Sequence, residues 1–220
     1  MPWYPDRDAT MKLSGAMKVR AGANKPVRRI VLHTVAFDPP EHPSQAPGGC
    51  YATWMNEKKD EMVSAHFCVE RDGRVVQFAD TDDITFGTGW CTSGSIHIEH
   101  AGSHPLPLTV DQLYYATRLM GWLATVHPDI RLEVEGTGVT DPGDPTRACI
   151  TCHKFIQVAA KREIAAGRLA AMKITDKACP GDGIMAQMRE IASGAKRWRA
   201  LMGANAAAGA SSALDMNSAP

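Results

Sequence analysis

The chain has no excess of charge of either sign and no long apolar run. Its 220 residues contain 24 lysines and arginines and 24 aspartates and glutamates. This neutral balance gives no electrostatic reason to expect a nucleic acid or an anionic membrane as a partner. No stretch approaches the roughly 18 consecutive apolar residues of a membrane span. We therefore expect no nucleic-acid binding and no membrane insertion, and we expect a monomer.

The N-terminus lacks the order of a secretory signal peptide, in which a basic segment precedes an apolar one. The first residues, MPWYPDRDATMK, are polar and interrupted by proline. We expect synthesis in the cytoplasm without a signal peptide and, if the protein is exported, another route. With no secretion signal, the six cysteines are expected to be mostly free thiols, of which one or two bind a metal.

Hydrophobic residues make up 44% of the chain, which favours one domain with a sizeable core. Strands are predicted where β-branched runs or alternation occur, and helices where apolar residues recur at helical spacing. The expected strands are 27–33, 63–70, 74–78 and 95–100, with a hairpin at the Asp72-Gly73 turn. The expected helices are 50–60, 109–126 with Thr109 as its cap, 153–172 and 183–202. This interleaving indicates an α/β or α+β layer fold. We expect a domain over 25–202, a loose arm over 1–24 and a flexible, low-complexity Ala/Gly/Ser tail over 203–220.

The stretch ACITCH, residues 148–153, contains the spacing C-x-x-C-H. It is compatible with covalent haem, a redox dithiol or half of a zinc knuckle. Haem attachment requires export, a dithiol requires a preceding strand, and the zinc knuckle lacks a second C-x-x-C. The remaining interpretation is that His153 carries the chemistry and that Cys149 and Cys152 are incidental thiols.

Three other groups are candidates for chemistry, and each has a purely structural alternative. His33 ends a strand predicted to be buried, where α/β folds bind ligands, or it is a histidine satisfied by the backbone. Glu99 lies on an apolar strand, where burial beside His33 would suit a general base, or it lies on an exposed face with His97. Lys177 and Cys179 lie in a turn suited to oxyanion and zinc binding, or in a plain loop before a helix.

Several motifs follow one another along the chain: VLHT (31–34), VSAHF (63–67), RDGRVVQ (71–77), SIHIE (95–99), the late His153 and KACPG (177–181). In this order they resemble the zinc-dependent type 2 N-acetylmuramoyl-L-alanine amidases, which are related to peptidoglycan recognition proteins and phage endolysins. The resemblance covers about residues 27 to 183. It implies an α/β fold in a single domain, with a central mixed sheet flanked by helices.

The same resemblance implies Zn²⁺ held by His33, His153 and Cys179, with Glu99 as the general base and Lys177 as the oxyanion-stabilising cation. His66 would be a supporting or packing residue. Asp141, in a TDPG stretch that mimics the aspartate ligand of another branch, precedes His153 and is the fallback third ligand.

Two further departures concern possible catalytic and substrate contacts. Ala65 stands where some branches have tyrosine, and FGTG (86–89) stands where the family has Trp-His-Ala-Gly.

The resemblance implies cleavage of the amide between N-acetylmuramic acid and L-alanine in peptidoglycan or a muropeptide. We expect a lytic role, as a phage endolysin released by a holin or as an effector delivered by a secretion system. The alternatives are a non-catalytic peptidoglycan-binding module, a cytoplasmic muropeptide-recycling amidase and, more remotely, a haem or redox protein.

Overall fold

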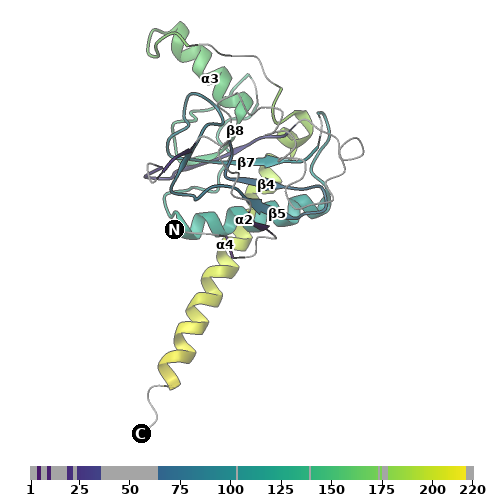
Figure 1. Ribbon diagram of the computed structural model, residues 1–220, viewed down its shortest axis with the longest axis vertical. Coiled ribbons are helices and arrows are strands. Elements are labelled where there is room, and N and C mark those ends of the chain that lie inside the picture. The colour runs from purple at the N-terminus through teal and green to yellow at the C-terminus, as the bar shows by residue number, and fades with distance from the viewer. Residues whose placement is uncertain are drawn as a thin grey trace.

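A six-stranded mixed sheet lies at the centre of the molecule (Figure 1). The computed structural model describes residues 4–5, 9–10, 19–21, 24–35, 64–102, 104–138, 140–172, 174 and 178–216. In spatial order the strands are β1 (Ala9–Thr10), β5 (Val75–Gln77), β4 (Phe67–Val69), β7 (Ser95–His100), β3 (Arg29–Leu32) and β8 (Cys149–Cys152). Only β4 and β5 pair antiparallel within this sheet, and a separate two-stranded sheet joins β2 (Val19–Arg20) to β6 (Ile84–Thr85). The expected α/β fold with a central mixed sheet is confirmed.

The hairpin predicted around the Asp-Gly turn is present as β4 and β5. Gly73 at this turn has a φ of +87°, which only glycine adopts at low cost. A Cβ at Gly73 would also lie 2.3 Å from the Tyr115 ring, so the turn excludes a larger residue on two grounds.

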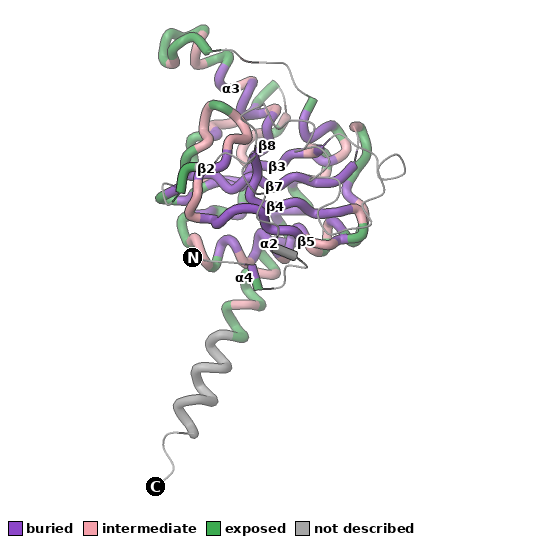
Figure 2. The backbone as a smooth tube through the Cα atoms, viewed as in Figure 1, coloured by how far each residue is buried: buried purple, intermediate pink, exposed green. Residues whose placement is uncertain are grey.

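The central strands β3 and β7 are buried along their whole length (Figure 2). One face of the sheet contributes isoleucine and leucine side chains, such as Leu32 and Ile98, to the main hydrophobic core. Side chains alternate along a strand, so the residues between these apolar ones point to the opposite face, and several of them are polar. His97 and Glu99 lie on that second face and are 0% and 5% exposed, so the alternative of a solvent-exposed strand face is wrong.

Helix α2 (Val110–Val126) begins at the predicted cap residue. The Thr109 hydroxyl accepts the Gln112 N–H at 3.0 Å, and the Gln112 side-chain oxygen accepts the Thr109 N–H at 3.2 Å. This reciprocal pair is a capping box. The Gln112 amide also donates to the carbonyls of Val69 and Ala101, so the helix start is fixed to the ends of β4 and β7.

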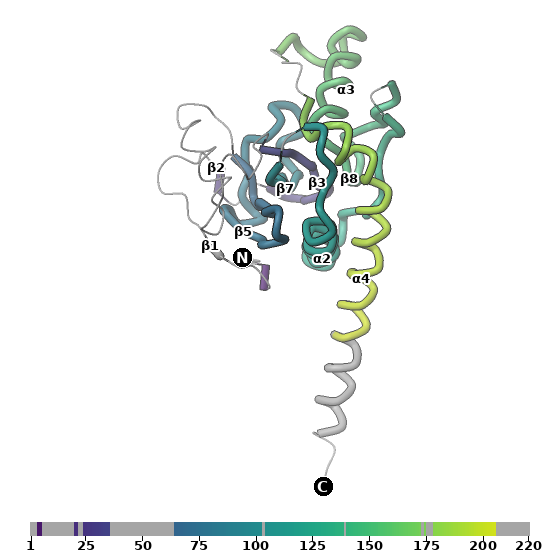
Figure 3. The backbone as a smooth tube through the Cα atoms, turned by 90° about the vertical axis from the view of Figure 1, so that its right-hand side faces the viewer, coloured from purple at the N-terminus to yellow at the C-terminus, as the bar shows by residue number. Residues whose placement is uncertain are grey.

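Helix α4 (Asp182–Met216) packs against α2, and the two helices cover one face of the sheet (Figure 3). Two glycines permit the close approach. A Cβ at Gly121 would lie 2.6 Å from Trp198 Cβ, and one at Gly194 would lie 2.7 Å from Thr117 Cγ2. A larger residue at either position would force the helices apart.

The last part of α4 differs from the expected flexible tail. The helix continues to Met216 and extends away from the sheet (Figure 1). Its alanines explain the difference, because alanine has the highest intrinsic helix propensity, whereas low complexity alone says nothing about local conformation. No helix in the described part of the chain has both the length and the apolar character of a membrane span.

Within the N-terminal segment, which is expected to be a loose arm, some described residues join the fold. Strand β1 pairs with β5, and the buried Tyr4 donates its backbone N–H to the Gln77 side chain at 2.8 Å. Helix α3 (His153–Ala165) ends earlier than predicted, near Gly167, whose φ is +70°. The helix expected over 50–60 lies outside the described residues.

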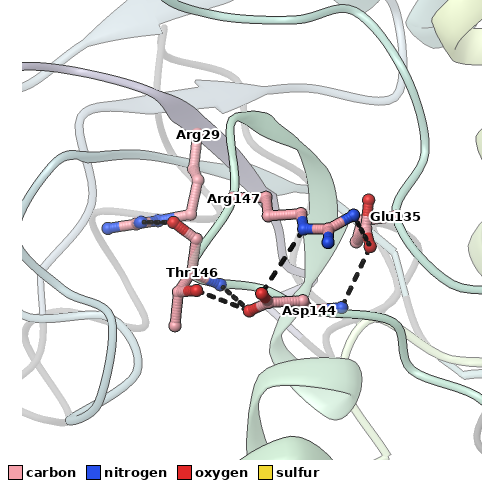
Figure 4. Close-up of polar contacts among 5 residues, drawn as sticks. All are labelled: Arg29, Glu135, Asp144, Thr146 and Arg147. Atoms are coloured by element: carbon pink, nitrogen blue, oxygen red, sulfur yellow. Dashed lines mark hydrogen bonds and ion pairs between the residues drawn. The ribbon is translucent and has the colours of Figure 1, made fainter.

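A buried arginine holds the loops at the amino end of the central strands (Figure 4). Arg29 donates to the Ser95 hydroxyl at 3.0 Å and to the carbonyls of Thr146 and Ser93. Beside it, Asp144 accepts from Thr146 and pairs with Arg147 at 3.5 Å. These contacts fix the loop that precedes β8, and with it the register of β8 against β3.

Candidate metal centre

Two histidines lie side by side at the carboxyl edge of the sheet. His33 directly follows β3 and His153 directly follows β8. The two strands are parallel neighbours with Leu32 opposite Cys152, so the residues after them also meet. Their rings are 5.0 Å apart, centre to centre. Ligands of α/β sheets commonly bind at this edge.

Cys179 reaches the same place from the turn before α4. Its carbonyl accepts the Lys154 N–H at 2.9 Å, which fixes the turn against the start of α3. Its sulfur lies 3.6 Å from His33 Nδ1 and accepts the Thr34 N–H at 3.4 Å. A backbone donor at this distance stabilises negative charge on the sulfur. Helix α3 (His153–Ala165) accounts for the first part of the 26 positions between His153 and Cys179.

These three donors fit a zinc ion. His33, His153 and Cys179 are 2%, 7% and 8% exposed, and their ligand atoms all lie within 4.8 Å of one another. From the usual Zn–S and Zn–N bond lengths, a tetrahedral site places sulfur and nitrogen about 3.6 Å apart. The observed separation of Cys179 Sγ and His33 Nδ1 is 3.6 Å. Two imidazoles and one thiolate leave a fourth position for water or substrate.

Glu99 flanks His33 on the neighbouring strand. The His33 N–H donates to the Ile98 carbonyl at 2.9 Å, and the His100 N–H donates to the His33 carbonyl at 3.0 Å. Because Leu32 and Ile98 are paired and both face the core, His33 and Glu99 lie together on the other face. A buried carboxylate is thus placed beside one of the three metal-binding candidates.

A sequence profile of the N-acetylmuramoyl-L-alanine amidase family matches residues 23–182. The chain belongs to this family. The match includes all three metal-binding candidates and Glu99. The enzyme class is therefore that of the N-acetylmuramoyl-L-alanine amidases, with peptidoglycan as the substrate class.

Solved structures agree with the amidase fold. N-acetylmuramoyl-L-alanine amidase LysC from Clostridium intestinale is 12% identical, with 84% of this chain and 93% of that chain covered and a TM-score of 0.54. Hydrolase AmiA from Staphylococcus aureus is 16% identical over 89% and 83% of the two chains, with a TM-score of 0.54. An AmpD derivative is 19% identical over 86% and 96%, with a TM-score of 0.52. Among curated protein sequences, no significant relative is found.

Two further buried histidines, His97 and His66, form a chain of contacts that begins at His33. His33 Nε2 is 2.9 Å from His97 Nδ1, and the His97 backbone N–H donates to His66 Nδ1 at 3.1 Å. His66 Nε2 is 2.9 Å from the Asp83 carbonyl. Burial lowers the pKa of His66 to about 4 and holds the pKa of His97 well below its usual value. Both rings are therefore neutral near pH 7.

The second histidine of the centre has a neighbour on its own helix. His153 Nε2 lies 3.1 Å from the Gln157 side-chain amide, one turn further along α3. The sequence alone did not indicate the contacts of Gln157 and His97 with the two histidines. The spacing of four residues on a helix could have indicated Gln157. The contact of His97 with His33 depends on the pairing of β3 with β7, which no local pattern specifies.

Cys149 and Cys152 do not form a redox pair. They lie three residues apart on β8, about 10 Å at the usual strand rise, whereas disulfide Cα atoms lie within about 7 Å. Burial raises the pKa of both thiols to about 12, so neither is a reactive thiolate. Strand β8 itself was not predicted.

The fallback ligand Asp141 lies in an exposed turn, where its carboxylate accepts from the Thr137 hydroxyl at 3.1 Å. In the part of the chain that the structure describes, the cluster of potential metal ligands contains Cys179 and not Asp141. Lys177, the predicted oxyanion-binding residue, lies outside the described residues.

Proposed function

We propose that the chain is a zinc-dependent enzyme that cleaves the amide between N-acetylmuramic acid and L-alanine, and that it does so to lyse bacterial cell walls. The observation that carries the proposal is the buried set of His33, His153 and Cys179, with Glu99 on the neighbouring strand. This set supplies the ligands of a catalytic zinc site and a base beside them.

His33, His153 and Cys179 would hold the zinc. When bound, zinc supplies Lewis acidity that polarises the scissile carbonyl and makes a water molecule acidic near neutral pH. The Thr34 N–H donates to the Cys179 sulfur and favours its thiolate form. Neutral His97 contacts Nε2 of His33, and a partner of this kind orients a metal-binding imidazole.

Glu99 would act as the general base and then as the general acid. Its carboxylate would take a proton from the attacking water and pass that proton to the amine of L-alanine as the C–N bond breaks. General catalysis of this kind contributes about 10²–10⁴-fold to the rate. Lys177 is proposed to stabilise the negative oxygen of the tetrahedral intermediate, a role that contributes about 3 kcal/mol for a well-placed donor.

In the proposed lytic role the substrate is the intact cell wall. The enzyme would reach it through release by a holin or delivery by a secretion system. A thiolate as the third ligand supports this choice, since cysteine in that place resembles the phage and recognition-protein branch. Turbidity clearing of purified sacculi, compared with cleavage of a soluble muropeptide, distinguishes lysis from muropeptide recycling. A binding module would sediment with sacculi and release no new L-alanine amine.

Metal analysis and wall-clearing assays on two variants test the site. Wild-type protein should contain one equivalent of zinc, and Cys179→Ser should lose both the zinc and the activity. Glu99→Gln should keep the zinc and lose about 10²–10⁴-fold in rate. Cys152→Ala is the matched control, because Cys152 is buried in the core and should leave zinc content and activity unchanged. Zinc and activity retained in Cys179→Ser would refute the assignment.

A further inference from the structure

His33 has two ring nitrogens with different neighbours. Nδ1 faces the Cys179 sulfur at 3.6 Å, and Nε2 faces His97 Nδ1 at 2.9 Å. A neutral imidazole carries one N–H, and a nitrogen that binds a metal must offer its lone pair. If Nδ1 is the metal ligand, the hydrogen of His33 lies on Nε2 and is donated to His97.

The surroundings of His97 hold its ring in this place. The residue is 0% exposed, and its ring stacks on His66 with 6.1 Å between centroids and an interplanar angle of 9°. Gly87 also lies against this ring. A Cβ at Gly87 would come within 2.3 Å of His97 Nδ1. The imidazole of His97 therefore fits only because residue 87 has no side chain.

We propose that His97 is a positioning residue that fixes His33 in the tautomer whose Nδ1 is free to bind the metal. The proposal rests on the zinc site of the proposed function and adds a residue that does not itself bind zinc. Since His97 Nδ1 accepts a hydrogen bond, its own hydrogen lies on Nε2. That nitrogen is buried, and no hydrogen-bond partner for it lies within the described residues.

A pair of substitutions separates the hydrogen bond from packing. His97→Leu removes the acceptor and keeps an apolar side chain of moderate size. His97→Asn keeps an acceptor, because Asn Oδ1, like His Nδ1, is two bonds from Cβ. Loss of a residue that orients a metal ligand typically weakens metal binding about 10–100-fold. We therefore expect zinc to bind about 10–100-fold more weakly to His97→Leu and within about threefold of wild type to His97→Asn.

Zinc dissociation constants from competition with a chromophoric chelator are the primary measurement. Nitrogen-detected NMR of the zinc-loaded protein should assign the hydrogen of His33 to Nε2 in wild type and in His97→Asn. Gly87→Ala is a second perturbation, since it displaces the His97 ring without removing it, and it should also weaken zinc binding. Thermal unfolding of the zinc-free variants shows whether each one is folded.

The outcomes distinguish this inference from the proposed function. Equal zinc affinity in wild type and folded His97→Leu would overturn the role of His97 and leave the zinc site intact. Equally weak binding in His97→Asn and His97→Leu would do the same, since the retained acceptor would then have no effect. Wild-type protein that binds no zinc would overturn both proposals.

Discussion

Acidification should destabilise the fold through two buried histidines, His66 and His100. Burial lowers the pKa of each to about 4, against 6.5 for an exposed imidazole. Between these values the unfolded chain binds a proton at each site and the folded chain does not. Stability is therefore constant above pH 6.5 and falls as the pH decreases from 6.5 to 4.

The size of the loss follows from the shifts. One pKa unit corresponds to about 1.4 kcal/mol, so each histidine removes about 3 kcal/mol of unfolding free energy across this window. The two sites together would remove about 6 to 7 kcal/mol, which is comparable to the whole stability of many domains. The protein should therefore unfold between pH 6 and pH 4.

Urea unfolding of the zinc-free protein at several pH values between 7 and 4.5 measures this effect. Removing zinc is necessary because protons compete with the metal for the same ligands. In His66→Asn, whose Oδ1 can still accept the His97 N–H, the slope of stability against pH should fall by up to about 1.4 kcal/mol per pH unit. An unchanged slope in this variant would refute the reasoning for His66.

Three smaller changes test the fold and the role of zinc. Thr109→Ala removes the cap of α2 and should lower the unfolding free energy by about 1 kcal/mol in urea titrations; no change would mean that the capping box is dispensable. Gly121→Ala should cost about 1–3 kcal/mol through overpacking, whereas the control Gly203→Ala, with no atom near its Cβ, should not destabilise. Chelation should lower the melting temperature of wild type and leave that of Cys179→Ser unchanged; an equal shift in both would argue against Cys179 as a ligand.

Turn residues, side-chain alternation and a helix cap are short sequence patterns, and they predict the elements that they form. The Asp-Gly turn, the alternation in 95–100 and the Thr109 cap each correspond to an observed element. Strand β8 was missed because its four residues follow a loop rich in proline and glycine and are half cysteine. Strand β1 has two residues, too few for any periodicity, and its existence depends on the edge that β5 offers.

The site was predicted from the order of motifs along the chain, and its geometry was not. Residues His33 and His153 are 120 positions apart, and only the pairing of β3 with β8 brings them together. Contacts of His97 and Gln157 with these histidines depend on side-chain directions that a motif does not contain. The resemblance thus indicates the candidate residues, and the strand register determines how they meet.

The position of β3 between β7 and β8 explains why His33 can lie next to both Glu99 and His153. Because β3 lies between β7 and β8, the residue after it is flanked by Glu99 on one side and His153 on the other. A ligand on an edge strand would have a neighbour on one side only. A shift of β3 by one residue would move His33 to the core face and remove it from both neighbours. The contacts of Arg29 at the opposite end of β3 therefore also act on the site, since they hold the register on which the metal centre depends.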